Sequence, residues 1–241
     1  MKRNEILNLN DWNLHQLTRA VSETPKEIKH TWPKIQEAYS WAERIARQAN
    51  SKMFKHSLRA SIEVAMIAVM ELSLGLPGVI TAILAPPFLQ GLVQKATIQK
   101  RFGLKIVSIL VELNRLKRYK LYRGAMLNGQ NASDLAVVRI VAILLQICDI
   151  VRVSYRGVPL GSLDSELIYY SSSKLFLDLK CFYIPFSHRM RLYNIQAKLA
   201  DFWFKHTDTL GYYSITAELG MTKLQRQQTI TNIYMTGSQY V

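Results

Sequence analysis

The chain has few cysteines, few prolines and glycines, and fewer acidic than basic residues. Its 241 residues include 2 cysteines, 7 prolines and 11 glycines, and 17 acidic residues stand against 31 lysines and arginines. So few cysteines exclude a disulfide framework. Cys148 and Cys181 both lie in apolar helical contexts, which indicates buried thiols in a reducing compartment. The N-terminus lacks an apolar core followed by a small-residue cleavage site, so we expect a cytoplasmic protein without a secretion signal.

Long uninterrupted apolar runs are also missing. Residues 62–84 are long enough to cross a bilayer, which takes about 20 residues. However, this run contains Glu63, Glu71 and a Gly-Leu-Pro-Gly break, each costly against lipid. The run 135–151 is interrupted by Arg139, Gln146 and Asp149. We therefore expect no membrane partner.

The main pattern in the sequence is the recurrence of apolar residues at helical spacing. With 49% hydrophobic and 20% charged residues, the composition is that of a globular protein. No window shows the alternation of a strand, so we predict an all-α fold, a compact multi-helix bundle. Its centre is the stretch Ala60–Gln90, two apolar segments hinged at residues 75–78. We expect the second segment to end at Pro86 and Pro87, because proline lacks an amide donor.

Other segments follow the same pattern. In residues 102–116 an apolar stripe is predicted at Ile106, Ile109, Leu110, Leu113 and Leu116. The remaining helices are predicted at Asp11–Thr24, Thr31–Asn50, Asp134–Val153, Asp164–Phe182, Pro185–Asp208, Tyr212–Leu219 and Thr222–Tyr234. Gln94–Arg101 is predicted as a helix or a turn. Loops are predicted at Asn50–Leu58 and Gly124–Ser133, and an irregular segment at Tyr155–Leu163. In Pro185–Asp208, Lys198, Asp201 and Lys205 are expected to form ion pairs along one face.

A formal net charge of +14 favours an anionic partner. The densest cationic run is Lys117, Arg118, Lys120 and Arg123, which we interpret as a solvated helix end. The neighbouring Tyr119 and Tyr122 fit a packing edge as well as base stacking. No nucleic-acid motif is present, so we do not expect a nucleic-acid partner.

Several stretches in order resemble the hydrolase domain of RelA/SpoT-type alarmone enzymes, an HD-type helical domain. Residues 185–208, PFSHRMRLYNIQAKLADFWFKHTD, are similar to the helix that follows the hydrolase core. Residues 102–116, FGLKIVSILVELNRL, resemble a Phe-Gly helix of the same family, and Ala38 and Tyr39 resemble its early Ala-Tyr helix. The resemblance covers most of residues 30–236. It implies a helical extension at 1–30, a degenerate HD-type domain at 31–210 and, at 211–241, helices similar to the lead-in to a synthetase domain.

The same resemblance implies where a catalytic manganese ion would be held. The family uses a lone His, a His-Asp pair and a later Asp to hold the ion that activates water against the 3′-pyrophosphate of (p)ppGpp. Here the lone His falls at Ala60, the pair at Ala85 and Pro86, and the late Asp at Arg156. We therefore expect no metal, no cofactor and no catalytic residue. His56, close to Ala60, is interpreted as an ordinary loop histidine.

Some cations persist where the family reads its nucleotide. Lys52, Lys55, Arg59 and Arg156 could converge on the former cavity as a vestigial ligand site, and we hypothesise that the guanidinium of Arg156 stands in the place of the ion. The alternative is an exposed loop arginine.

Three functions stay open at this point. The first is a catalytically inactive, regulatory or interaction protein of the stringent response, with an alarmone synthetase as its candidate partner. The second is a sensor that binds (p)ppGpp or another nucleotide without hydrolysing it. The third, least favoured, is an active phosphohydrolase with rebuilt chemistry.

Overall fold

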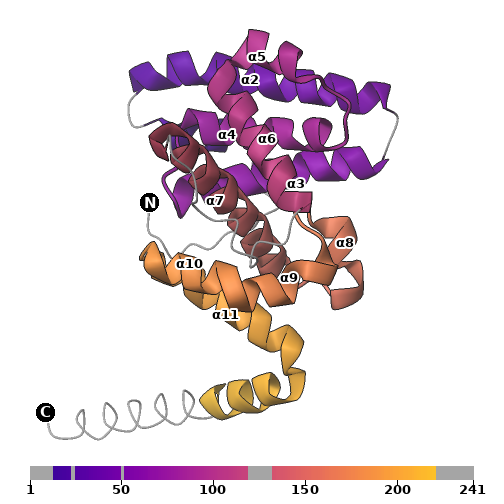
Figure 1. Ribbon diagram of the computed structural model, residues 1–241, viewed down its shortest axis with the longest axis vertical. Coiled ribbons are helices and arrows are strands. Elements are labelled where there is room, and N and C mark those ends of the chain that lie inside the picture. Colours follow the sequence, from indigo (N-terminus) through magenta and orange to yellow (C-terminus); the bar gives the residue numbers. More distant parts are fainter. Residues whose placement is uncertain (1–12, 23–24, 50–51, 119–131, 221–241) are drawn as a thin grey trace, which may run out of the picture. The chain divides into compact units, whose positions relative to one another are not determined.

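The computed structural model describes residues 13–22, 25–49, 52–118 and 132–220. For residues 25–28, 52–55, 118, 132–135, 172 and 173 it describes the backbone alone. Within these ranges every regular element is helical, so the all-α prediction is confirmed. The chain divides into two compact units, Met1–Leu199 and Ala200–Val241. The first unit holds most of the described helices (Figure 1).

The main helices are α1 Leu14–Val21, α2 Pro25–Gln48, α3 Lys52–Met70, α4 Leu76–Leu89, α5 Lys95–Phe102, α6 Leu104–Arg118 and α7 Ala132–Arg156. The shorter elements after them are η2 Leu160–Ser162, α8 Leu163–Glu166, α9 Ser172–Asp178, η3 Leu179–Tyr183 and α10 Ile184–Arg189. α11 Tyr193–Thr207 crosses the boundary between the units, and residues 209–220 of the second unit are helical. None of the described helices is both long and apolar enough to cross a membrane.

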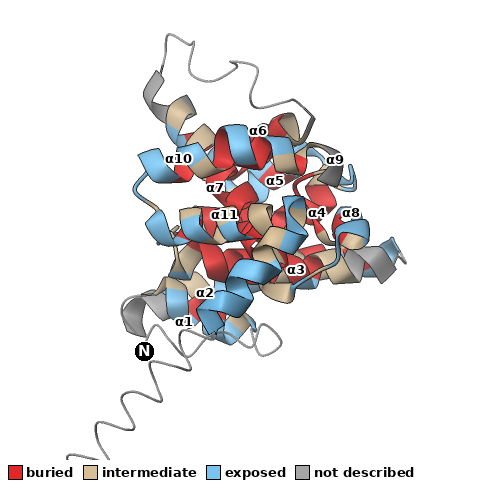
Figure 2. Cartoon of the chain, turned by 90° about the horizontal axis from the view of Figure 1, so that it is seen from below, coloured by how far each residue is buried: buried red, intermediate tan, exposed pale blue. Residues whose placement is uncertain are grey.

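Helix α4 is the centre of the first unit. Every residue from Gly78 to Phe88 is buried, because the helix is apolar on all sides and packs against α2, α3, α6 and α7. Figure 2 shows buried residues on α4 and on the inner faces of the helices around it. The predicted stripe on α6, from Ile106 to Leu116, is buried as expected.

Two prolines lie inside α4 instead of ending it. The helix continues through Pro86 and Pro87 to Leu89, so the predicted stop is wrong. Pro86 has no amide to donate to the carbonyl of Ala82, four residues earlier. The hydroxyl of Tyr169 donates to that carbonyl instead, at 3.2 Å. A distant tyrosine thus supplies the hydrogen bond that the proline removes.

Several predicted boundaries are also wrong. Helix α2 begins at Pro25, before Thr31, and contains Pro33. Helix α3 begins at Lys52, so the predicted loop at 50–58 is helical from that residue on.

The predicted helices in the last third of the first unit are interrupted. An extended stretch at 167–171 separates α8 from α9. The single helix predicted at 185–208 breaks between α10 and α11, where Arg191 takes a positive φ of 57°. Cys148 is buried, but Cys181 is exposed, because Leu179, Phe182 and Tyr183 take the buried face of the π-helical turn η3.

Other predictions concern residues that fall outside the described ranges. These are the helix at 222–234, residues 124–131 of the predicted loop and part of the cationic run, Tyr119 to Arg123. The predicted domain boundaries after residues 30 and 210 rest on the family resemblance and stay predictions. Helix α2 runs across the first of them.

Candidate functional site

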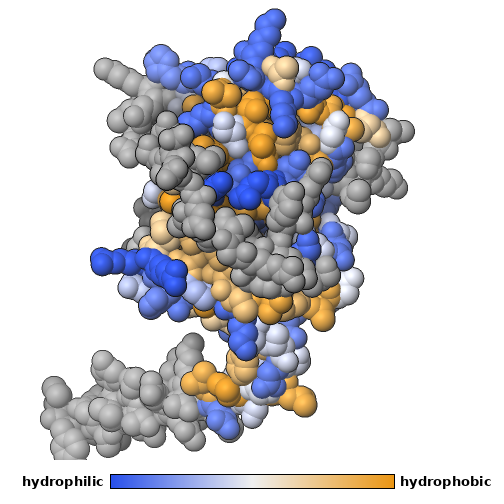
Figure 3. All heavy atoms as spheres, viewed as in Figure 1, coloured by the Kyte–Doolittle hydropathy of each residue, from blue (hydrophilic) through white to orange (hydrophobic). Residues whose placement is uncertain are grey.

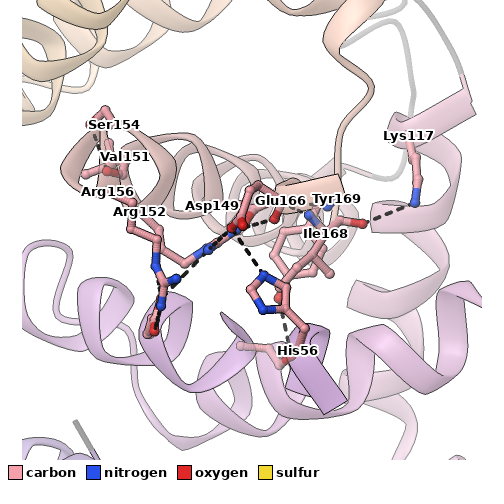
Figure 4. Close-up of polar contacts among 12 residues, drawn as sticks. His56, Lys117, Asp149, Val151, Arg152, Ser154, Arg156, Glu166, Ile168 and Tyr169 are labelled. Atoms are coloured by element: carbon pink, nitrogen blue, oxygen red, sulfur yellow. Dashed lines mark hydrogen bonds and ion pairs between the residues drawn. The ribbon is translucent and has the colours of Figure 1, made fainter. Parts of the chain in front are cut away.

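Arg152 is the centre of a buried group of charges between α3, α7 and α8. Its side chain is 0% exposed. Nε and Nη2 donate to Asp149 Oδ1 at 3.1 and 3.0 Å, and Nη2 also donates to the carbonyl oxygen of Glu166. Nη1 lies 3.4 Å from Glu166 Oε2 and 3.7 Å from Glu63 Oε2. One guanidinium thus faces three carboxylates from three helices. Figure 4 shows Arg152 with Asp149 and Glu166.

Asp149 connects this arginine to the chain beyond α8. Its second oxygen, Oδ2, accepts the backbone N–H groups of Ile168 at 2.7 Å and Tyr169 at 3.0 Å. Lys117 of α6 donates to the carbonyl of Ile168 at 3.1 Å. These bonds fix the extended segment and place the Tyr169 hydroxyl on α4.

Glu63 is the carboxylate that α3 contributes. It lies on the apolar helix, 1% exposed, where an unpaired charge would be very costly. Arg156 meets it with two nitrogens, Nε at 3.1 Å from Oε2 and Nη2 on Oε1. Arg152 adds a third contact, and Arg59 Nε lies 4.0 Å from Oε1. Cations therefore face Glu63 from α7 and from its own helix.

Glu166 and His56 form the outer side of the group. His56 Nε2 lies 3.2 Å from Glu166 Oε2. Burial alone raises the pKa of Glu166, but the hydrogen bonds and charges of His56 and Arg152 outweigh it and lower the pKa. For Arg152, burial lowers the pKa, and the carboxylates of Asp149, Glu63 and Glu166 more than offset this, so the pKa lies above its ordinary value. Both shifts favour the charged forms.

We call this group the Arg152 cluster: His56, Arg59, Glu63, Asp149, Arg152, Arg156 and Glu166. Within it, three guanidinium groups face three carboxylates. Such a cluster ties α3, α7 and α8 together, and removing one member leaves a buried charge uncompensated. It resembles a metal centre only in that a central cation is surrounded by carboxylates.

The residues do not fit the manganese ion that the family resemblance implies. Ala60 and Ala85 are buried and carry only methyl groups, and Pro86 offers no side-chain donor. Glu63, Asp149 and Glu166 each already face a guanidinium. Within the described ranges, no three His, Cys, Asp or Glu residues are grouped so that they could hold a metal ion.

The four predicted ligand-site cations are placed differently. Arg59 and Arg156 meet at Glu63, with 57% and 23% of their side chains exposed. Arg156 is the last residue of α7, not part of a loop, and its guanidinium points towards α3. Lys52 and Lys55 lie on the first turn of α3, and their side chains are outside the described part of the structure.

Other members of the cluster were not predicted. Asp149, Arg152 and Arg156 occur at i, i+3 and i+7 of a helix that is otherwise apolar around them, which places them on one face. From that spacing the sequence could have predicted that these charged side chains lie together. Glu166 could not be found in this way, because its role depends on how the chain turns after α7.

A second, more exposed ion pair lies just beyond the end of α3. Lys198 Nζ contacts Glu71 Oε1 at 2.7 Å and lies 4.9 Å from the centre of the Tyr155 ring. The Tyr155 hydroxyl is 3.5 Å from the same oxygen. Lys198 thus pairs with Glu71, in the turn after α3, and not with Asp201 as predicted.

Comparison with known proteins adds no relative. No protein-family model matches this sequence, and no curated protein is significantly similar to it.

Proposed function

We propose that this protein is a pseudohydrolase: a regulatory or interaction protein on a helical scaffold that resembles the RelA/SpoT-type hydrolase domain. Its candidate partner is an alarmone synthetase. In this proposal the scaffold has exchanged a metal centre for an internal salt-bridge cluster, and the protein acts through its surface.

The main support for the proposal is the environment of the Arg152 guanidinium. A fully buried guanidinium supplies the positive charge between carboxylates of α3, α7 and α8. Arg156, at the position that the resemblance assigns to the late aspartate, adds a second cation against Glu63. A cluster in which every guanidinium faces a carboxylate supports a structural role better than a reactive one.

The nucleotide-sensor alternative has weaker support. Phosphate binding needs guanidinium groups with donors to spare. Arg156 already has two nitrogens on Glu63, and Arg152 is fully buried. A nucleotide at this place would have to compete with these internal carboxylates.

The proposal is tested first by turnover and metal content. The purified chain is incubated with (p)ppGpp and manganese, pyrophosphate release is followed, and bound metal is measured after dialysis. We expect no turnover and no stoichiometric metal. Pyrophosphate release together with one tightly held manganese ion would contradict the proposal.

Calorimetry with (p)ppGpp separates the sensor from the interaction protein. If the chain is a sensor, exchanging Lys52 and Arg156 for glutamine abolishes binding. A control variant in which the exposed Arg189 and Arg191 become glutamine should then bind normally. For an interaction protein we expect no specific heat of binding in any of the three.

The partner is tested by adding the chain to a purified alarmone synthetase from the same organism. We expect a complex in size-exclusion chromatography and a changed rate of (p)ppGpp synthesis. A synthetase that neither binds nor changes its rate would remove this partner from the proposal.

A further inference from the structure

The surface from Gly91 to Lys105 forms a basic cap on the first unit. It comprises the turn after α4, helix α5 and the start of α6. Along these residues only Ile98 is buried, and Val93 and Phe102 are half-buried. In Figure 3 hydrophilic side chains cover the end of the unit where Figure 1 shows α5. The cap therefore presents a nearly continuous exposed surface.

The charge of this cap has one sign. Lys95, Lys100, Arg101 and Lys105 are all exposed, and the sequence has no Asp or Glu between Glu71 and Glu112. None of the four forms an ion pair with a carboxylate in the described part of the chain. Arg101 instead lies over the ring of Trp41, 5.0 Å from its centre. The nearest acidic residue on that face of α2 is Glu37, one helical turn before Trp41. The cap keeps an excess of positive charge.

Exposed leucines lie among these cations. Leu92 is 44% exposed before Lys95, and Leu104 is 63% exposed between Arg101 and Lys105. The aromatic residues of the region are not free for stacking, because Trp41 contacts both Arg101 and Phe102. A surface for single-stranded nucleic acid would offer aromatic faces to bases. Cations with large aliphatic side chains between them are instead typical of surfaces that lie on anionic lipid.

We infer that the basic cap binds an anionic phospholipid surface, with its cations at the headgroups and Leu92 and Leu104 inserted among them. This binding is peripheral and needs no spanning helix. It departs from the expectation of no membrane partner, which rested on the absence of a spanning segment alone. It is independent of the proposed pseudohydrolase function, since no residue of the Arg152 cluster takes part.

The test is co-sedimentation of the full chain with vesicles of phosphatidylcholine, with and without phosphatidylserine. A cap variant exchanges Lys95, Lys100, Arg101 and Lys105 for glutamine. A control variant exchanges the exposed Lys29, Lys34, Arg189 and Arg191, which removes the same charge elsewhere. A third variant exchanges Leu92 and Leu104 for serine. Thermal unfolding of each variant checks that it is folded.

We expect the wild type to bind the phosphatidylserine vesicles and to dissociate as salt is raised. Each cation at an anionic surface contributes a factor of about five to partitioning, so the cap variant should bind at least about tenfold more weakly than the control. The leucine variant should also bind more weakly, and its remaining binding should be more sensitive to salt.

Three results would overturn the inference. The first is an equal loss of vesicle binding in the cap and control variants. The second is wild-type binding to phosphatidylcholine alone that is as strong as binding to the anionic vesicles. The third is the absence of vesicle binding together with binding to a single-stranded RNA of matched charge that the cap variant loses.

Discussion

The cations of the Arg152 cluster and those of the basic cap have opposite surroundings. Arg152 is fully buried and faces three carboxylates, whereas Lys95, Lys100, Arg101 and Lys105 are exposed and face none of the described carboxylates. A buried charge is tolerated only when its partners are fixed, so the first group serves the fold. An exposed charge costs little and remains available, so the second serves recognition. The net charge of +14 therefore says little about function until each cation is placed.

The contrast between the buried and the exposed cations is tested most directly by removing the side chain of Arg152. Arg152→Ala leaves Asp149, Glu63 and Glu166 without their shared cation, and we expect a loss of about 3–5 kcal/mol in unfolding free energy. Urea denaturation measures it. The matched control in the cap, Lys100→Ala, should change stability by no more than about 0.5 kcal/mol. Similar losses in the two variants would show that burial does not separate the two regions.

A smaller loss is expected where the cluster supports α4. Tyr169→Phe removes the hydroxyl that donates to the carbonyl of Ala82, which has no amide donor at Pro86. An unsatisfied buried acceptor costs about 1–3 kcal/mol. The exposed Tyr193→Phe is the control in the same urea titration. An unchanged midpoint for Tyr169→Phe would show that the helix satisfies this carbonyl in another way.

Acid should weaken the cluster and leave the cap unaffected. The pKa of Glu166 in the folded chain lies below its ordinary 4.5. A carboxyl with a lowered folded pKa stabilises the protein above its unfolded pKa, and this contribution is lost as the pH falls through the folded value. We expect unfolding free energy to fall below about pH 4.5 less steeply in Glu166→Gln than in the wild type. Urea titrations over a pH series measure both slopes, and equal slopes would contradict the assignment.

The smallest effect is expected at the partly exposed pair of Lys198 and Glu71. Lys198→Ala removes a 2.7 Å contact, but both side chains are about one quarter exposed. Pairs nearer the surface contribute about 0–1 kcal/mol. We expect a loss at the upper end of that range, above that of Arg47→Ala, whose pair with Glu43 is largely exposed. Thermal unfolding of the two variants ranks them, and a larger loss for Arg47→Ala would reverse the order.

Predictions from the apolar pattern succeeded where a helix has one clear apolar face, as α6 does, or is apolar on all sides, as α4 is. The stripe on α6 and the buried core of α4 are as expected, because the hydrophobic effect depends on apolar area and not on specific partners. They failed at ends and interruptions. Helix α4 continues through Pro86 and Pro87, and Tyr169, 87 residues from Ala82, donates to the buried carbonyl that Pro86 leaves without an amide donor. Arg191 ends a helix through its backbone conformation, which no spacing of side chains indicated.

The candidate site was predictable only in part. An acidic residue such as Glu63 on an apolar helix indicates a buried partner, and Asp149, Arg152 and Arg156 share a helical face. Which cations reach Glu63, and that Glu166 joins them, depends on the packing of α7 and α8 against α3. Arg156 was selected from the sequence as a candidate ligand-site residue, whereas its neighbour Glu63 was not.

The sequence by itself determined that the chain is helical, where its most apolar helices lie, and that no side chain at Ala60, Ala85 or Pro86 can bind a metal ion. Those properties are local, since residue type and spacing suffice for them. The tertiary structure alone decided which charges are neutralised and which stay exposed, because ion pairs form between helices that are distant in the chain. The pairing of Arg152 with Glu63 is a result of that folding.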